Sequence, residues 1–329
     1  MTARCHVCRS EDTRRMFQAP LEKFTKAMGR TGGVDYHFCN HCTVLFQYPI
    51  FDQAEYEKFY EKVQRSDETG YRTGEVPSKH LKKKRMDTAF KWNQLRLMDL
   101  ERLLPGKRIF EVGPAEGTLL ASFRDRGFTV SGVEPLAPYA RYARDVYKLD
   151  VSDGYFDANL AAKTKADMVI LDGVLEHLMT PFDMLLLIRK MISPDGILYM
   201  GGLPIAEFST PYMANIAHIT LWSRRSLAFA LECAGFTPLN ILAGRPGNRP
   251  AEWVCIAQAC REPRDIEREQ PVTYPAPDFD KLAAHWDETL KRYALADDRR
   301  RKYGPAYTLL TRTVRAVPGA RELVQKFAK

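Results

Sequence analysis

The sequence has no long apolar run and no secretion signal at its amino-terminal end. A helix that spans a bilayer needs about 20 mostly apolar residues, and no stretch of about 18 or more exists in these 329 residues. The opening residues, MTARCHVCRS, lack both an apolar core and a small-residue cleavage site. We therefore expect a cytoplasmic protein without a transmembrane segment.

Composition excludes disordered and fibrous chains. The sequence is 45% hydrophobic and 27% charged, which is typical of globular domains. Its length allows a full α/β domain with one or two smaller units. The formal net charge of +8 suits an anionic partner, but a similar excess is common on proteins that bind none. Charge alone therefore says little about function.

Cysteine is sparse, yet four of the seven cysteines form two matched pairs. Cys5 and Cys8 make one C-x-x-C knuckle, and Cys39 and Cys42 make a second one about 30 residues later. Two such knuckles are typical of a four-thiolate zinc site, whereas disulfides are not expected in a reducing cytosol. A redox dithiol or a coincidence of spacing is the alternative. Because four thiolates leave no open coordination position, we interpret the zinc as structural.

Changes in composition divide the chain into four parts. We expect a zinc-binding region at residues 1–60, a lid or linker and then a long helix at 61–105, a nucleotide-binding α/β domain at 106–262 and a helical extension at 263–329.

Two basic runs lie outside the α/β part. Residues 79–85 begin the long helix, and residues 299–302 belong to the extension. A solvated helix face is the ordinary interpretation, and a phosphate or nucleic-acid patch is the alternative. The apolar face of the last helix favours packing on the main domain or on a second subunit, as in a homodimer. Weak attachment of that basic helix to a membrane surface is the alternative.

Strands and helices alternate in the third part, which predicts a mostly parallel sheet with helices on both faces. Ligands of such sheets bind beyond the carboxyl ends of the strands, at the point where the strand order reverses. The last two strands predict a closing hairpin. In chain order, the expected elements are strand 108–112, helix 118–126, strands 128–133 and 168–171, helix 181–191, and strands 196–200, 238–243 and 252–259.

A glycine turn, Glu111-Val112-Gly113-Pro114-Ala115-Glu116-Gly117, follows the first of these strands. The dinucleotide pattern G-x-G-x-x-G fails at Ala115 and Thr118, whereas the pattern acid-x-Gly-x-Gly-x-Gly fails at Ala115 alone. An acid two residues before the first glycine suits a cationic amino-acid head and repels a pyrophosphate. Glu134, about 20 residues after Gly113, can accept both hydroxyls of a ribose. These features favour S-adenosylmethionine.

Residues 108–260 resemble class I S-adenosylmethionine-dependent methyltransferases. The segment from Asp172 to Leu178, DGVLEHL, is similar to the "VLEH" segment of the branch that modifies small molecules and sugars. The stretch from His218 to Phe236 resembles the "H…FS…SL…AGF" motif of that branch. The two knuckles, followed by Leu45-Phe46-Gln47, are similar to the zinc-binding region of nucleotide-sugar C-methyltransferases.

This resemblance implies a Rossmann-like, mostly parallel seven-stranded sheet and a methyltransferase that uses S-adenosylmethionine. It implies a polar small-molecule acceptor, such as a hydroxyl or carbon of a nucleotide-linked sugar or a polysaccharide unit. The C-methyltransferases commonly carry a "HEH" tract. His218 matches its second histidine, but Asn215-Ile216-Ala217 precedes it here, so O- and N-methylation stay open.

The candidate catalytic residues are His218, His177 and Tyr71. His218 is the candidate general base, because an imidazole titrates near neutral pH; a histidine bonded in a loop is the alternative. His177 is a candidate for lining the acceptor site or for capping and packing, and Tyr71 for closing over the substrate from the lid. The candidate cofactor-binding residues lie at strand ends and in the turns after them: Glu111, Gly113, Pro114, Ala115, Gly117, Glu134, Pro135, Asp153, Asp172 and Gly173.

Two other functions compete with a small-molecule methyltransferase. An RNA-binding methyltransferase would grip the nucleic-acid backbone with the zinc region and the basic runs. However, enzymes that methylate base amino groups carry an Asn/Asp-Pro-Pro-aromatic tract where this chain has Leu171-Asp172-Gly173-Val174, and the basic runs lack interleaved aromatics. Nucleic acid is therefore not the expected partner. A non-catalytic zinc scaffold is the third hypothesis.

Overall fold

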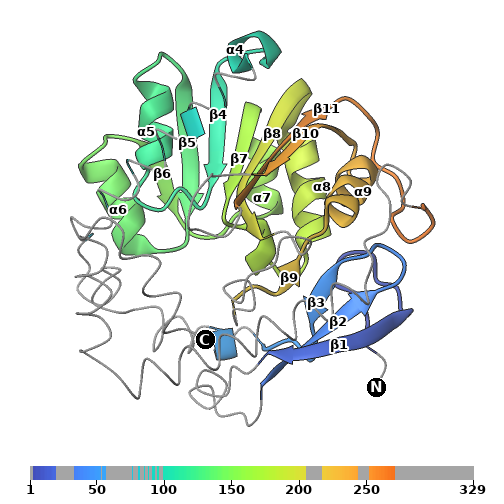
Figure 1. Ribbon diagram of the computed structural model, residues 1–329. Helices are drawn as coiled ribbons and strands as arrows, with labels where there is room; N and C mark the ends of the chain where they lie inside the picture. The colour runs from blue at the N-terminus through green and yellow to red at the C-terminus, as the bar shows by residue number, and fades with distance from the viewer. Residues whose placement is uncertain are drawn as a thin grey trace, which may run out of the picture.

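The computed structural model describes residues 3–19, 33–52, 54–56, 99–204, 217–243 and 252–270, together with positions 76, 81, 85, 88, 91, 92 and 95. Tyr71, most of the expected long helix and the extension beyond residue 270 lie outside the described residues. Within them, a seven-stranded sheet and a four-stranded sheet form the frame of the molecule (Figure 1). No helix in the described part is long and apolar enough to cross a membrane.

The larger sheet has the strand order β10-β11-β8-β7-β4-β5-β6. The chain moves outward from β4 through β5 to β6 and then returns to the other side of β4 as β7, so the strand order reverses between β4 and β7. The predicted hairpin is present at one edge, where β11 runs antiparallel to both neighbours. The strands are β4 (Arg108–Val112), β5 (Thr129–Glu134), β6 (Asp150–Asp153), β7 (Ala166–Asp172), β8 (Ile192–Pro204), β10 (Phe236–Ala243) and β11 (Glu252–Ala259).

Helices cover both faces of this sheet, as predicted. Successive side chains of a strand point to opposite faces, so Val169 and Leu171 of β7 join one apolar cluster, and Met168 and Ile170 join the other. On the first face lie α7 (Ala158–Lys163), α8 (Pro181–Met191) and α9 (Arg224–Cys233). On the second lie α4 (Leu100–Leu103), α5 (Thr118–Arg124) and α6 (Ala137–Asp145). The mostly parallel α/β fold is therefore confirmed.

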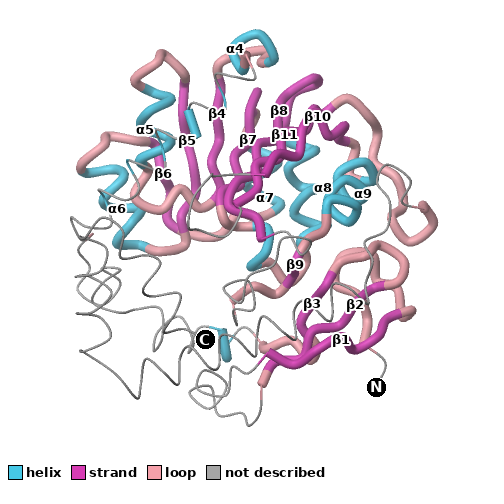
Figure 2. Tube along the Cα trace, viewed as in Figure 1, coloured by secondary structure: helices cyan, strands magenta, loops and turns pink. Residues whose placement is uncertain are grey.

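The smaller sheet joins two distant parts of the chain. Its strands β1 (Thr13–Ala19), β2 (Val34–Cys39) and β3 (Leu45–Gln47) are consecutive, but the fourth, β9 (Thr220–Leu221), comes from the other end of the α/β domain and pairs antiparallel with β3. Figure 2 shows this small sheet below α8 and α9.

One continuous core ties the small sheet to the α/β domain. Cys8 and Phe46 belong to the same apolar cluster as Trp222, which directly follows β9, and Phe229 of α9. Ser223 caps α9 and its hydroxyl lies 3.2 Å from the Thr43 hydroxyl, so the cap of this helix also contacts the small sheet. The small sheet is therefore packed on the domain rather than connected to it by a linker alone.

Candidate functional site

The turn after β4 leads the chain from the sheet into α5. Gly113, Ala115 and Gly117 have φ angles of 71°, 51° and 84°, in the region where only glycine avoids strain. A Cβ at position 117 would lie 2.6 Å from Leu149 Cδ1 and 3.1 Å from Ala143 Cβ, so a larger residue would displace these side chains. Ala115 bears a cost of about 1–2 kcal/mol, which the hydrogen bond from its N–H to Glu134 Oε2 offsets in part.

Glu134 ends β5 and fixes two loops at once. Its carboxylate accepts the N–H of Ala115 at 2.8 Å and the N–H of Leu136 at 2.9 Å. Hydrogen bonds to an ionised group are stronger than neutral ones, so this carboxylate holds the glycine turn against the turn after β5. A carboxylate offers about four acceptor positions, so these two bonds are compatible with further donors such as ribose hydroxyls.

Three buried carboxylates lie at this end of the sheet. Glu111, Glu116 and Glu134 are 2%, 1% and 3% exposed. Glu116 accepts the Thr118 hydroxyl at 2.7 Å. Burial, and then the charges of Glu116 and Glu134, raise the pKa of Tyr139. The site is therefore negative, which favours a cationic ligand and disfavours a phosphate chain.

Asp172 and Asp153 lie at the ends of two other strands. Asp172 ends β7 beside the glycine turn and forms a mostly buried ion pair with Lys91. Asp153 ends β6 opposite Glu134, is 53% exposed and pairs with Arg144 Nη1 at 2.9 Å. The remaining candidate cofactor residues, Pro114, Pro135 and Gly173, lie in the turns after β4, β5 and β7.

A second cluster, which we call the histidine cluster, consists of Glu176, His177 and His218. Glu176 and His177 belong to η2 (Leu175–His177), the short 3-10 helix beyond the carboxyl end of β7, and His218 lies two residues before β9. One carboxylate oxygen and one nitrogen of each imidazole lie within 4.8 Å of one another. The two ring centroids are 5.0 Å apart. The structure therefore brings the two candidate catalytic histidines together, with an acid beside them.

The tautomer of His177 follows from its hydrogen bond. Its Nδ1 lies 2.8 Å from the carbonyl oxygen of Ala217, which can only accept. In the neutral ring Nδ1 therefore carries the proton, and Nε2 carries the lone pair. Burial lowers the pKa of His177 and the Ala217 carbonyl opposes that shift, so the net change favours the neutral ring.

The small sheet fixes the backbone of His218. Tyr36 Oη and Gln47 Nε2 both donate to the His218 carbonyl oxygen, at 3.0 and 2.9 Å. Gln47 also donates to Tyr36 Oη at 3.0 Å, and Tyr56 Oη donates to Gln47 Oε1 at 3.2 Å. All three side chains are buried, so this network, here called the carbonyl clamp, is shielded from water.

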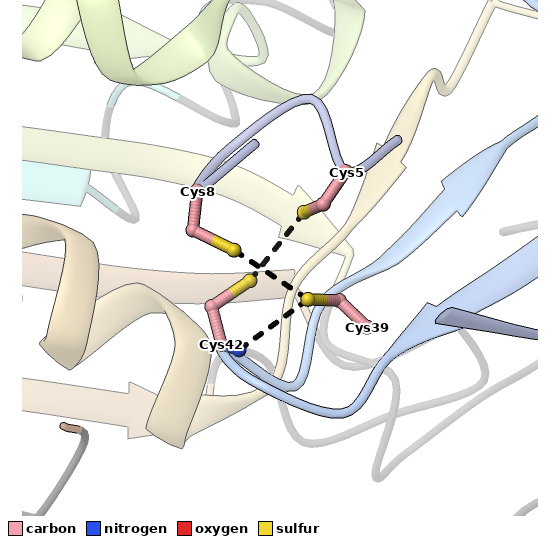
Figure 3. Close-up of side chains that lie close together, drawn as sticks. All are labelled: Cys5, Cys8, Cys39 and Cys42. Atoms are coloured by element: carbon pink, nitrogen blue, oxygen red, sulfur yellow. Dashed lines mark hydrogen bonds between the residues drawn. The ribbon is translucent and has the colours of Figure 1, made fainter. Parts of the chain in front are cut away.

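The four cysteines of the two knuckles point toward one centre (Figure 3). Cys5 Sγ lies 3.6 Å from Cys42 Sγ, and Cys8 Sγ lies 3.5 Å from Cys39 Sγ. These separations exclude disulfides, in which the sulfurs are about 2.05 Å apart. They are close to the roughly 3.8 Å expected between thiolates that surround a zinc ion at about 2.3 Å. The residues therefore fit a four-coordinate metal ion.

The histidines inside the knuckles bind elsewhere. His6 Nε2 lies 2.9 Å from the carbonyl oxygen of Gln47, and His41 Nε2 lies 3.1 Å from that of Ile266. Each imidazole therefore fixes a neighbouring segment and leaves the centre to the thiols. His41 connects the second knuckle to the segment that follows β11.

Sequence reasoning missed Glu176 and the carbonyl clamp. Glu176 belongs to the DGVLEHL segment that carries the resemblance and directly precedes His177. This position indicated that an acid lies near the candidate histidines. The contacts of Tyr36 and Gln47 with His218 could not be predicted from the sequence, because the residues are 182 and 171 positions apart in the chain. Ala217 contributes only its backbone carbonyl, which no residue pattern reveals.

Residues 84–241 match the sequence model of a family described as a methyltransferase domain. This segment is therefore similar to a methyltransferase domain and makes up slightly less than half of the chain. None of the curated proteins matches this chain.

Solved methyltransferases share parts of the fold. An O-methyltransferase family protein from Burkholderia thailandensis is 18% identical, with a TM-score of 0.39 over 48% of this chain and 52% of that one, so this chain spans about half of its length. Magnesium protoporphyrin IX methyltransferase from Synechocystis is 14% identical, with a TM-score of 0.47 over 63% of this chain and 99% of that one. Likeness at this level carries no information about the methyl acceptor.

Proposed function

We propose that the protein transfers the methyl group of S-adenosylmethionine to a polar small molecule, namely a hydroxyl or carbon of a nucleotide-linked sugar, a polysaccharide unit or a related biosynthetic intermediate. The observation that carries the proposal is the group of three buried carboxylates at the ends of β4 and β5, within a methyltransferase domain. S-adenosylmethionine has a sulfonium and an ammonium, so a negative site favours it.

The cofactor would lie along what we call the cofactor cradle, the turn at residues 113–117 together with Glu134. In this proposal Glu134 accepts the ribose hydroxyls and Glu111 faces the ammonium of the amino-acid part. The other candidate contacts are turn and strand-end residues: Pro114, Pro135, Asp153, Asp172 and Gly173. The hydrogen bond between Ala115 and Glu134 supports this arrangement, because it holds both sides of the cradle before the ligand arrives.

The proposed chemistry is an in-line displacement. The acceptor oxygen forms a bond to the methyl carbon while the carbon–sulfur bond breaks, and the electron pair of that bond stays on sulfur. For a hydroxyl acceptor, His218 takes the proton, so the products are a methyl ether, S-adenosylhomocysteine and a protonated imidazole. His177 is the candidate for lining the acceptor site, and Tyr71 for closing over the substrate.

The surroundings of His218 support the role of base. A general base must be held within hydrogen-bond reach of the proton that it removes. His218 is buried, lies against the neutral ring of His177 and has its backbone fixed by the carbonyl clamp. A histidine with a merely structural role would not need both a fixed backbone and a position at the carboxyl end of β7.

We also propose that Cys5, Cys8, Cys39 and Cys42 bind a structural zinc ion. When bound, zinc would supply folding free energy to the small amino-terminal sheet, whose strands β1, β2 and β3 have seven, six and three residues. Four thiolates leave no position for a substrate, so the ion takes no part in methyl transfer. The ion would affect the reaction indirectly, because it stabilises the small sheet, and β3 of that sheet carries Gln47 of the carbonyl clamp.

A label-transfer experiment tests this function. The full-length protein is incubated with S-adenosylmethionine carrying a radioactive methyl group and, separately, with nucleotide-sugars, free saccharides and small RNAs. We expect label in a nucleotide-sugar or saccharide, together with S-adenosylhomocysteine. Label in RNA, with an affinity that falls steeply with salt, would replace this proposal by the RNA hypothesis. Absence of any heat of S-adenosylmethionine binding would leave only the zinc scaffold.

A further inference from the structure

We infer that the histidine cluster binds one divalent transition-metal ion, held by the carboxylate of Glu176 and by one nitrogen each of His177 and His218. The cluster is separate from the four thiols and lies at the carboxyl end of β7. The inference deepens the proposed function and rests on it in one respect, because the ion acts on the reaction only if the acceptor binds beside it.

The spacing of the three groups fits a single ion. Ligand atoms at about 2.1 Å from a metal are roughly 3–4.2 Å from one another. In the cluster all three ligand atoms lie within 4.8 Å, and His177 Nε2 lies 3.8 Å from Glu176 Oε1. Small side-chain movements would therefore bring the three atoms to coordination distance without a change of the backbone.

The hydrogen bond of His177 is the second, independent observation. A histidine that binds a metal usually donates its other ring N–H to a carbonyl or a carboxylate, which fixes the tautomer and the direction of the lone pair. His177 does so through Nδ1 to the Ala217 carbonyl, which leaves Nε2 as the ligand atom. Ala217 directly precedes His218, so the carbonyl that orients one ligand is covalently attached to the next.

The backbone of the third ligand is also fixed. The carbonyl clamp holds the backbone of His218 through Tyr36 and Gln47. Two imidazoles and one carboxylate are thus presented by a 3-10 helix and by a clamped segment rather than by mobile loop tips. Pre-organisation of this kind is what separates a binding site from a chance grouping of side chains.

The ligand set indicates which ions would bind. The two imidazoles favour iron, nickel, copper or zinc, and the single carboxylate, a harder ligand than the four thiols, also suits manganese. Three ligands leave coordination positions open for an acceptor hydroxyl. The bound ion would lower the pKa of that hydroxyl, and its proton would pass to water while His218 serves as a ligand. Without the ion, His218 takes the proton directly.

Calorimetric titration with Mn²⁺ tests the inference. The full-length protein, with any metal at the four thiols left in place, is dialysed against metal-free buffer without chelator and titrated with MnCl₂, an ion with little preference for thiolates. We expect one equivalent to bind, with at least tenfold weaker affinity in Glu176→Gln. Glu262→Gln, which changes an exposed acid, should bind as the wild type does. Absence of Mn²⁺ binding by the wild type, or equal affinity in Glu176→Gln, would overturn the inference.

Two further measurements keep the test decisive. If Glu176→Gln does not fold, His177→Gln replaces it, with the same tenfold loss expected and equal affinity again the contradiction. Each preparation is also titrated with S-adenosylmethionine. Mn²⁺ binding without cofactor binding supports the metal site and removes the proposed function. Cofactor binding without Mn²⁺ binding removes the metal site and leaves the proposed function intact.

Discussion

The cofactor cradle and the histidine cluster both lie at the carboxyl ends of strands, yet they are assembled in opposite ways. The cradle comes from one short stretch, because the bond from Ala115 to Glu134 spans only 19 positions. The histidine cluster needs the bond between His177 and Ala217 across 40 positions, and the clamp adds contacts across 171 and 182. The first is a local structure, and the second exists only in the complete fold.

This difference teaches which perturbations reach which region. Unfolding of the amino-terminal sheet should remove the carbonyl clamp and so displace His218. It should leave the structure of the cofactor cradle unchanged. A change in the cradle should weaken the cofactor and leave the histidine cluster in place. For each variant, the change in turnover is therefore compared with the change in cofactor affinity.

The largest effect is expected from the double substitution Cys5→Ser and Cys39→Ser. One thiolate is lost from each knuckle, so the metal ion proposed there should leave and β1, β2 and β3 should unfold. Turnover should fall by at least about 100-fold because the clamp is lost, whereas the affinity for S-adenosylmethionine should change by no more than about threefold. Metal analysis, calorimetry and a methyl-transfer assay check this.

Cys260→Ser is the matched control for that experiment. Cys260 is exposed and lies outside the knuckles, so this variant should retain metal and activity. If the double variant kept full turnover, the small sheet would have no influence on the histidine cluster. An equal loss of cofactor affinity would show that the two regions are not separable.

His218→Ala should have the next largest effect. Loss of a positioned base or of a metal ligand should lower turnover by about 10²-fold or more for a hydroxyl acceptor. Cofactor affinity should stay nearly unchanged, because His218 is separate from the turn at residues 113–117 and from Glu134. Turnover equal to that of the wild type would assign His218 a structural role.

Gln47→Leu should have a smaller effect through the same path. Leucine fills a similar volume but cannot donate to the His218 carbonyl oxygen, so this buried carbonyl keeps only Tyr36 of the clamp. We expect about tenfold lower turnover, corresponding to about 1.4 kcal/mol, with unchanged cofactor affinity.

Gln18→Leu is the control for the clamp variant. Gln18 lies in the same small sheet, on β1, and donates to Asp35 near the surface. This variant should behave as the wild type in both measurements. Equal losses of turnover in the two variants would mean that the effect comes from general loosening of the sheet.

The smallest effect concerns pH. His177 is neutral in the folded protein because burial lowers its pKa, whereas in the unfolded chain it takes up a proton below about pH 6.5. The unfolded state then binds more protons, so the free energy of unfolding falls as pH drops below that value. His177→Gln should reduce this fall by up to about 1.4 kcal/mol per pH unit. Urea unfolding at pH 7.5 and 5.5 measures it, and equal slopes would contradict the assignment.

Most of the α/β fold could be predicted from the sequence, because its strands and helices carry strong local signals. The helix at 181–191 and the strand at 252–259 have the predicted bounds. The strand β6 was missed because only Val151 of its four residues is buried. The strand β9 was missed because its two residues are extended only by pairing with β3.

The candidate sites show the same difference between features with a local sequence signal and features that depend on contacts between distant residues. The four cysteines and the glycine turn are marked by spacing within short segments, and the structure brings the predicted residues together. Complete hydrogen bonding and exclusion of water decide where Tyr36 and Gln47 lie, and neither property is visible in a residue pattern. Tyr71 lies outside the described residues, so its proposed role stays a prediction.

The most direct test of the central claim is a calorimetric titration of the wild type and of Glu134→Ala with S-adenosylmethionine. The account predicts one site in the wild type and an affinity weaker by about 1–3 kcal/mol in the variant, because charged hydrogen bonds are lost. Glu262→Gln, which changes an exposed acid outside the cradle, should leave the affinity unchanged. No binding by the wild type, or equal affinity in Glu134→Ala, would contradict the assignment of the cofactor cradle.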